Sequence, residues 1–131
     1  MADSEIGVWR LVEARARDAQ GNTVPSQFGP TPLGVVTFDG RRMIAALGDA
    51  REAVPELEQP RQYNSYAGPY RFDGTTLVTR VDCASSPDRM GTDQVRGVRF
   101  EAGGRRMVLT PPPRMIRGVM HHPELVWERM G

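Results

Sequence analysis

The stretch YAGPYRFDGTTLVTR, residues 66–80, places an Asp-Gly pair between two strand-like runs. Asp-Gly is typical of tight hairpin turns, and each flanking run alternates large apolar side chains with polar ones. The stretch therefore predicts an antiparallel hairpin that buries one face. A two-residue turn would place Phe72 opposite Thr75 and Tyr70 opposite Leu77, and opposed side chains share a face of the sheet.

The same pattern continues along the chain. Asp-Gly at 39–40 and Gly-Gly at 103–104 lie between apolar runs and predict two more hairpins, the first of which would place Phe38 opposite Arg41. The loops between the runs are rich in proline, and a short helix interrupted by Pro55 is expected within 48–62. Strands are expected at about 7–17, 34–39, 41–47, 66–72, 75–83, 92–101, 105–110 and 124–130.

Eight strands joined mainly by hairpins predict an all-β antiparallel fold, with residues 1–131 as a single domain. A sandwich would bury one face of each strand. A closed eight-stranded barrel would also remove the exposed edges and leave room for side chains or one small ligand. Carrying the alternation through the hairpins gives one apolar face: Val36, Phe38, Met43, Ala45, Leu47, Tyr66, Tyr70, Phe72, Leu77, Val81, Val98, Phe100, Met107, Leu109, Leu125 and Trp127.

Two polar side chains of the segment GTDQVRGVRF, residues 91–100, fall on this apolar face. A four-residue turn at 101–104 would pair Phe100 with Arg105 and Arg96 with Leu109, which points Gln94 and Arg96 inward. Thr79 and Arg129 fall on the same face, and Arg129 lies close enough to the chain end to reach solvent. A buried guanidinium requires a partner, so Arg96 is the sharpest functional signal in the sequence.

Composition excludes several classes of function. All 17 basic residues are arginine, so lysine Schiff-base chemistry is ruled out, and the net charge of +1 gives no indication of a nucleic-acid partner. The single Cys83 is expected to be a small buried residue, and no spacing suggests a metal or cofactor site. The N-terminal sequence lacks the pattern of a signal peptide, and no apolar run reaches membrane-spanning length. A cytoplasmic location is expected.

An ordered set of short motifs resembles the bacterial lipocalin-like domain family. The set contains Gly7-Val8-Trp9-Arg10-Leu11-Val12, Phe28-Gly29-Pro30, Gly34-Val35-Val36-Thr37-Phe38-Asp39, Gly40-Arg41-Arg42-Met43, Tyr66-Ala67-Gly68-Pro69-Tyr70, Gly91-Thr92-Asp93-Gln94-Val95-Arg96, Thr110-Pro111-Pro112 and Leu125-Val126-Trp127-Glu128-Arg129. The resemblance implies an eight-stranded lipocalin-like barrel with an internal cavity. Members often carry His-His in the fifth strand, where this chain has Thr79-Arg80-Val81-Asp82, so no proton-transfer role of those histidines carries over.

The candidate ligand site is centred on Arg96 and Gln94, assisted by Tyr66 or Tyr70. Arg96 and Gln94 would hold a carboxylate, enolate or carbonyl oxygen of a ligand. Two alternatives remain open: Arg96 ties the barrel's own tyrosines together, or it reaches the rim through a different register. The remaining candidate ligand contacts are Thr79, Phe38, Met43 and Trp127.

Arg96, Tyr66 and Tyr70 are the best candidates for catalysis. A phenol beside Arg96 would have a lowered pKa and could act as a general acid. The pair His121-His122 is expected to be exposed in a proline-rich loop, and the alternative is a catalytic role, because histidine is the usual proton carrier near neutral pH. Trp9 and Trp127 are expected to pack where the first and last strands meet.

These observations favour an intracellular barrel that binds one small, mostly apolar, oxygenated ligand. The alternative is an enzyme, an isomerase or cyclase, that uses the same cavity for acid/base isomerisation, cyclisation or dehydration of an enolisable substrate. The expected partner is a small molecule and neither nucleic acid nor membrane. A homodimer is left open by the sequence.

Overall fold

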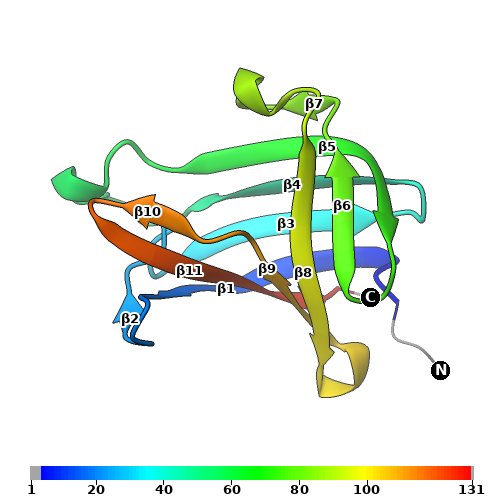
Figure 1. Ribbon diagram of the computed structural model, residues 1–131, viewed down its shortest axis with the longest axis horizontal. Coiled ribbons are helices and arrows are strands. Elements are labelled where there is room, and N and C mark those ends of the chain that lie inside the picture. The colour runs from blue at the N-terminus through cyan, green and yellow to red at the C-terminus, as the bar shows by residue number, and fades with distance from the viewer. Residues whose placement is uncertain (1–3, 131) are drawn as a thin grey trace.

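The computed structural model describes residues 4–130 and shows a closed antiparallel β-barrel (Figure 1). Its eight strands follow the order β11-β9-β8-β6-β5-β4-β3-β1, and the pairing of β1 with β11 closes the barrel. The strands are β1 (Gly7–Arg17), β3 (Pro32–Phe38), β4 (Arg42–Asp49), β5 (Tyr63–Phe72), β6 (Thr76–Arg80), β8 (Asp93–Glu101), β9 (Arg106–Thr110) and β11 (Val119–Arg129).

Short elements complete the chain: β2 (Thr23–Val24), β7 (Cys83–Ala84), β10 (Arg114–Ile116) and the 3-10 turns η1 (Glu56–Glu58), η2 (Pro87–Arg89) and η3 (Ala102–Gly104). These turns are the helical pieces found within residues 4–130, so the predicted all-β eight-stranded barrel is confirmed. In the same part of the chain, no helix has the length and apolar character needed to cross a membrane.

Each predicted hairpin is present, but each predicted pairing is wrong by two residues. Phe72 pairs with Leu77, Phe38 with Met43, and Phe100 with Met107. The first two turns are wider than predicted because an aspartate caps each of them. Asp73 accepts hydrogen bonds from the amides of residues 75 and 76, and Asp39 from those of residues 41 and 42.

A shift of two residues leaves every side chain on its predicted face, because the strand repeat is two. All sixteen residues assigned to the apolar face belong to the core or pack against it. Strand β1 departs from simple alternation through a bulge between Leu11 and Glu13. The bulge lets Ala14 and Ala16 continue the buried face, whereas strict alternation would have turned Glu13 inward.

Aromatic rings fill one end of the barrel. Trp9 lies 6.2 Å from Phe100, Phe100 lies 6.1 Å from Phe72, and Phe38 meets Tyr70 edge-on at 5.1 Å between ring centroids. Figure 1 shows both chain ends at this side, whereas β2, β10 and η1 gather at the other. The guanidinium of Arg129 does not leave for solvent, since it stacks on Trp9 at 4.2 Å.

The predicted strand 75–83 is interrupted after Arg80. Strand β5 pairs with β7 before Gly68 and with β6 after it, so the connecting residues 81 and 82 bulge out of the ladder beside that glycine. A Cβ at Gly68 would lie 1.9 Å from the carbonyl oxygen of Arg80, which leaves room for hydrogen alone. The interruption turns Cys83 outward, and the prediction that it is buried is wrong.

Candidate functional site

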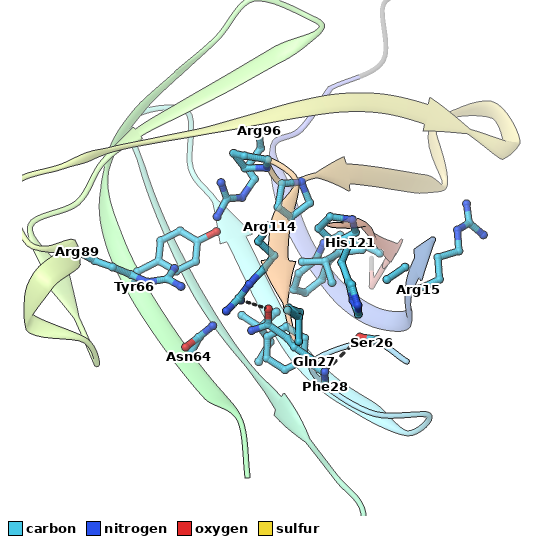
Figure 2. Close-up of a pocket in the computed structure, with 18 residues that line it drawn as sticks. Arg15, Ser26, Gln27, Phe28, Asn64, Tyr66, Arg89, Arg96, Arg114 and His121 are labelled. Carbon is cyan, nitrogen blue, oxygen red and sulfur yellow. Dashed lines mark hydrogen bonds between the residues drawn. The ribbon is translucent and has the colours of Figure 1, made fainter. Parts of the chain in front are cut away.

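A cavity of about 150 Å³ occupies the end of the barrel opposite the aromatic cluster. Its apolar wall includes Phe28, Leu47, Ile116, Leu125 and Trp127. Its polar wall includes Ser26, Gln27, Asn64, Tyr66, Arg89, Arg96, Arg114 and His121 (Figure 2). The cavity therefore joins an oily surface to a concentrated group of hydrogen-bond donors, as small-molecule sites in proteins do.

Arg96 projects from β8 into this cavity and is half-buried. Within residues 4–130 its guanidinium donates one hydrogen bond, from Nη1 to the carbonyl oxygen of Val95 at 2.9 Å, and enters no ion pair. Burial lowers the pKa of Arg96; the Tyr66 phenol opposes this shift and the positive Arg89 adds to it. Arginine nevertheless stays charged in proteins, so the cavity wall carries a cation with unused donors.

Arg89 brings a second guanidinium to the same wall from the turn η2. Its Nη1 donates to Oε1 of Gln94 at 2.9 Å, and no ion pair of Arg89 occurs in the described part of the chain. Gln94 is buried, and its Nε2 has no hydrogen-bond partner among residues 4–130. Gln94 thus positions Arg89 at the cavity wall through its carboxamide oxygen.

Tyr66 stands between the two arginines, with its hydroxyl turned towards Arg96 (Figure 2). Burial raises the pKa of its phenol above the ordinary value of 10.0, although Arg96, the Gln94 side chain and Arg89 each act to lower it. The expected net lowering of this pKa by Arg96 is therefore wrong, since desolvation is the larger effect. The phenol is protonated at neutral pH and presents an O–H donor.

The charges around the cavity are unbalanced. No aspartate or glutamate belongs to the cavity lining within residues 4–130. Arg15 at the rim is neutralised by Glu124 at 2.8 Å, and Arg114 donates to Oε1 of Gln27 at 2.5 Å. Gln27 is neutral, so Arg89, Arg96 and Arg114 all lack a carboxylate partner in the described residues, and their positive charges suit an anionic oxygen group.

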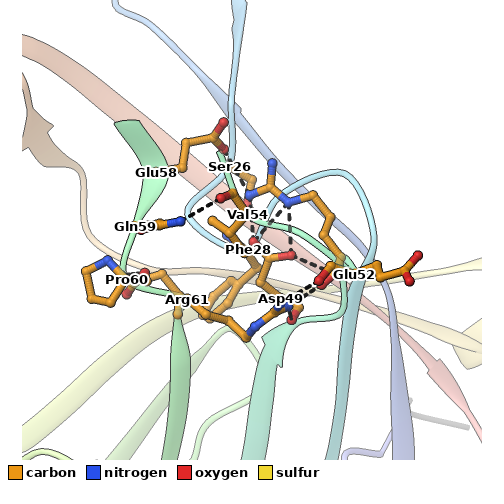
Figure 3. Close-up of polar contacts among 11 residues, drawn as sticks. Ser26, Phe28, Asp49, Glu52, Val54, Glu58, Gln59, Pro60 and Arg61 are labelled. Atoms are coloured by element: carbon orange, nitrogen blue, oxygen red, sulfur yellow. Dashed lines mark hydrogen bonds and ion pairs between the residues drawn. The ribbon is translucent and has the colours of Figure 1, made fainter. Parts of the chain in front are cut away.

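An ion-pair network fixes the loop that covers this end of the barrel (Figure 3). Arg51 binds both oxygens of the buried Asp49, with Nη2 2.6 Å from Oδ2, and also reaches Glu58 at 3.0 Å. This pairing with Arg51 holds the pKa of Asp49 below its usual value despite burial. Arg61 donates to the carbonyl oxygens of Asp49 and Arg51.

The network also fixes Phe28 in the cavity wall. Gly29 has φ of 71°, and a Cβ there would lie 2.6 Å from Nε of Arg51. Glycine is required both by this left-handed conformation and by the close approach of the guanidinium. Phe28, the preceding residue, is consequently held in the interior, where it is 4% exposed.

The predicted ligand contacts divide into three groups. Arg96, Tyr66 and Trp127 line the cavity. Gln94 and Thr79 are buried next to it but do not belong to its lining. The others, Tyr70, Phe38 and Met43, lie in the packed part of the core.

Tyr70 is already satisfied within the protein. Its hydroxyl donates to Oε2 of Glu5 at 2.6 Å and accepts from the amide of Gly40 at 2.9 Å. Burial, followed by the hydrogen bond and charge of Glu5, raises the pKa of this phenol. The Tyr70 hydroxyl therefore ties the N-terminal segment to the β3–β4 turn, at the end of the barrel away from the cavity.

Sequence reasoning missed Arg89, Asn64, Arg114 and Phe28. Arg89, Arg114 and Phe28 lie in short elements or irregular segments, where strand alternation assigns no face. Asn64 lies in β5, which starts at Tyr63, three residues before the predicted start of that strand. Sequence reasoning also placed His121 wrongly in an exposed loop. Strand β11 begins at Val119 rather than near 124, so His121 is a strand residue, 8% exposed, in the cavity wall. The segment 114–121 forms a short hairpin, and Gly118 in its turn is the sequence signal that could have shown it.

Comparison with known proteins agrees with this architecture. A family model described as a lipocalin-like domain matches residues 6–130. No curated protein and no solved structure matches the chain at a significant level.

Proposed function

The chain belongs to the lipocalin-like domain family, and on this basis we propose that it binds one small, mostly apolar molecule through an anionic oxygen group. Arg96 and Arg89 hold the anion, and the Tyr66 hydroxyl donates a further hydrogen bond. Trp127, Phe28 and the aliphatic wall hold the apolar body. The family supports small-molecule binding in a cavity, and the residues of this cavity support the choice of an anion.

The observation that carries the proposal is that the guanidiniums of the cavity wall, Arg89 and Arg96 together with Arg114 near the mouth, have no carboxylate partner among residues 4–130. An unneutralised charge in a partly desolvated site is unfavourable for the free protein. A ligand carboxylate would neutralise it and accept the unused N–H donors of Arg96 in a bidentate manner. The same contact would relieve the mutual repulsion of Arg89 and Arg96.

The cavity volume limits the ligand. About 150 Å³ is comparable with a known apolar protein cavity that accepts benzene. A ligand of one ring or a short branched chain, with its acid group at the arginine wall, fits this space. Long-chain acids would have to extend through the mouth between η1 and β10.

Calorimetric titration with benzoate and benzamide tests the proposal, because the two probes share shape and differ in charge. Benzoate is expected to bind at least about 10-fold more tightly, the value of one charge-assisted hydrogen bond over a neutral one. Arg96→Met should remove this preference, and Arg71→Met, on the exposed face of β5, should keep it. Equal affinities for benzoate and benzamide in the wild type would refute an anion site.

A further inference from the structure

His121 is the one imidazole in the cavity wall within residues 4–130. It is buried, and its ring has no hydrogen-bond or ion-pair partner in the described part of the chain. It also borders the mouth, a second space of about 160 Å³ that shares Ser26, Gln27, Arg114 and Ile116 with the cavity. In Figure 2 the imidazole lies across the cavity from Arg96 and Tyr66.

An unpaired imidazole opposite two guanidiniums combines a proton acceptor with donors that can stabilise negative charge. Imidazole takes up and releases protons near neutral pH. The guanidiniums and the Tyr66 phenol are donors that stabilise an oxygen on which negative charge develops. A carbonyl compound held between them would have its oxygen at the arginine wall and its carbon chain towards His121.

We propose that the cavity catalyses proton transfer at the carbon next to a carbonyl group, with His121 as the base and Arg96, Arg89 and Tyr66 as the group that stabilises the enolate. The inference rests on the proposed function, since the same arginine wall must first bind the ligand. The substrate class is a small enolisable carbonyl compound, preferably a 2-oxo acid, whose carboxylate and keto oxygen both face the arginines.

The step is balanced without a co-reactant. A ring nitrogen of His121 takes the proton, and the electrons of the C–H bond form a carbon–carbon double bond. The carbonyl π electrons move to oxygen, where the arginines and the phenol stabilise the enolate. The imidazolium then returns the proton to the same carbon, which exchanges hydrogen with solvent, or to a conjugated carbon, which moves a double bond.

The neighbouring side chains are compatible with this role. Arg15 is neutralised by Glu124 at 2.8 Å, whereas Arg114, the cross-strand partner of His121, donates to the neutral Gln27 at 2.5 Å and keeps its positive charge. Glu58 at the mouth is held by Arg51 at 3.0 Å. No other carboxylate borders the cavity or its mouth in the described residues, so the His121 imidazole is the only unpaired side chain there with a nitrogen lone pair that can accept a proton from carbon.

Proton NMR in D₂O tests the inference with 2-oxobutanoate, whose C3 protons exchange on enolisation. Wild-type protein is expected to accelerate the exchange over a protein-free blank. His121→Ala should slow the protein-dependent rate at least about 100-fold, the usual contribution of a general base. Calorimetry should show that 2-oxobutanoate still binds within about twofold of wild type, since the arginine wall is intact. The adjacent exposed His122→Ala is the matched control and should retain the wild-type rate.

Added imidazole separates chemistry from structure. It should restore exchange in His121→Ala in proportion to its concentration and beyond its effect in a blank, which a purely structural role would not produce. His121→Asn serves if the alanine variant is unstable. Binding of 2-oxobutanoate without accelerated exchange by the wild type, or with undiminished exchange by the His121 variants, overturns the inference but leaves ligand binding standing. Failure of both benzoate and 2-oxobutanoate to bind overturns the proposed function and this inference together.

Discussion

Replacing Arg96 by methionine should stabilise the free protein and abolish its preference for anions. Methionine keeps the unbranched stem that packs on the cavity wall and removes the charged head. In the part of the chain that the structure describes, that head has one hydrogen bond, to the Val95 carbonyl at 2.9 Å, and burial lowers the pKa of the guanidinium. The substitution therefore removes an unneutralised charge and few favourable contacts.

The expected gain in the free energy of unfolding follows from the degree of burial of Arg96. Exchanging buried ionic groups for apolar ones stabilises proteins by about 1–4 kcal/mol, and the half-buried Arg96 belongs at the lower end, about 1–2 kcal/mol. An unfolding entropy of about 2.1 cal/mol/K per residue makes 1 kcal/mol equal to about 4 °C in Tm for a chain of 131 residues. The variant should thus melt about 4–8 °C higher.

The expected loss of affinity for benzoate is independent of the change in stability. Charge-assisted hydrogen bonds contribute about 1.5–3 kcal/mol, so Kd for benzoate should rise roughly 10- to 150-fold in Arg96→Met. Thermal melts followed by circular dichroism, paired with calorimetric titration, measure both effects. Arg71→Met, exposed on the outer face of β5, should change Tm by less than about 2 °C. A lower Tm in Arg96→Met would refute the argument and show that the guanidinium holds the barrel together.

Three further substitutions and one control substitution test the surrounding structure. Asp49→Asn should lower Tm at pH 7. Because the pKa of Asp49 is lowered in the folded state, the contribution of its carboxylate to stability is complete above about pH 4 and is lost as the pH falls further. Melts at decreasing pH should therefore show the Tm of the wild type converging on that of the variant. Gly68→Ala should destabilise by about 3 kcal/mol in urea titrations, since its Cβ would meet a backbone oxygen at 1.9 Å, whereas Gly74→Ala, with open space but φ of 103°, should lose only about 1 kcal/mol. Arg129→Met should lower Tm by about 3–6 °C through loss of the stacking on Trp9 and two hydrogen bonds to backbone carbonyls, a change that tryptophan fluorescence can follow.

The barrel could be predicted from the sequence because the patterns that specify its hairpins and strand faces lie within short stretches of the chain. Turn residues mark the hairpins, and alternation marks the faces. The pairings were wrong by two residues, yet an error of two preserves each face, which is why Gln94, Thr79 and Tyr66 were correctly expected to be buried. An error of one residue would have reversed every one of these assignments.

The cavity was less predictable because alternation assigns a face and gives no depth along the barrel. Tyr66 and Tyr70 share a face, but they lie towards opposite ends of the interior, and only Tyr66 reaches the cavity. Arg89 was invisible for a different reason. It enters the cavity from a 3-10 turn, where neither the strand repeat nor the helical repeat predicts direction.

The position of Arg96 determines which groups can neutralise its charge. An internal network would need the two inward tyrosines as partners, but the Tyr70 hydroxyl is already bound by Glu5 and Gly40 at the far end. Tyr66 alone remains, and a single neutral phenol cannot neutralise two guanidiniums. The carboxamide oxygen of Gln94 accepts a hydrogen bond from Arg89, but it is neutral and does not cancel the charge of that guanidinium. The described interior supplies no anion to Arg89 and Arg96. We therefore expect a ligand in the cavity to carry the negative charge that neutralises them.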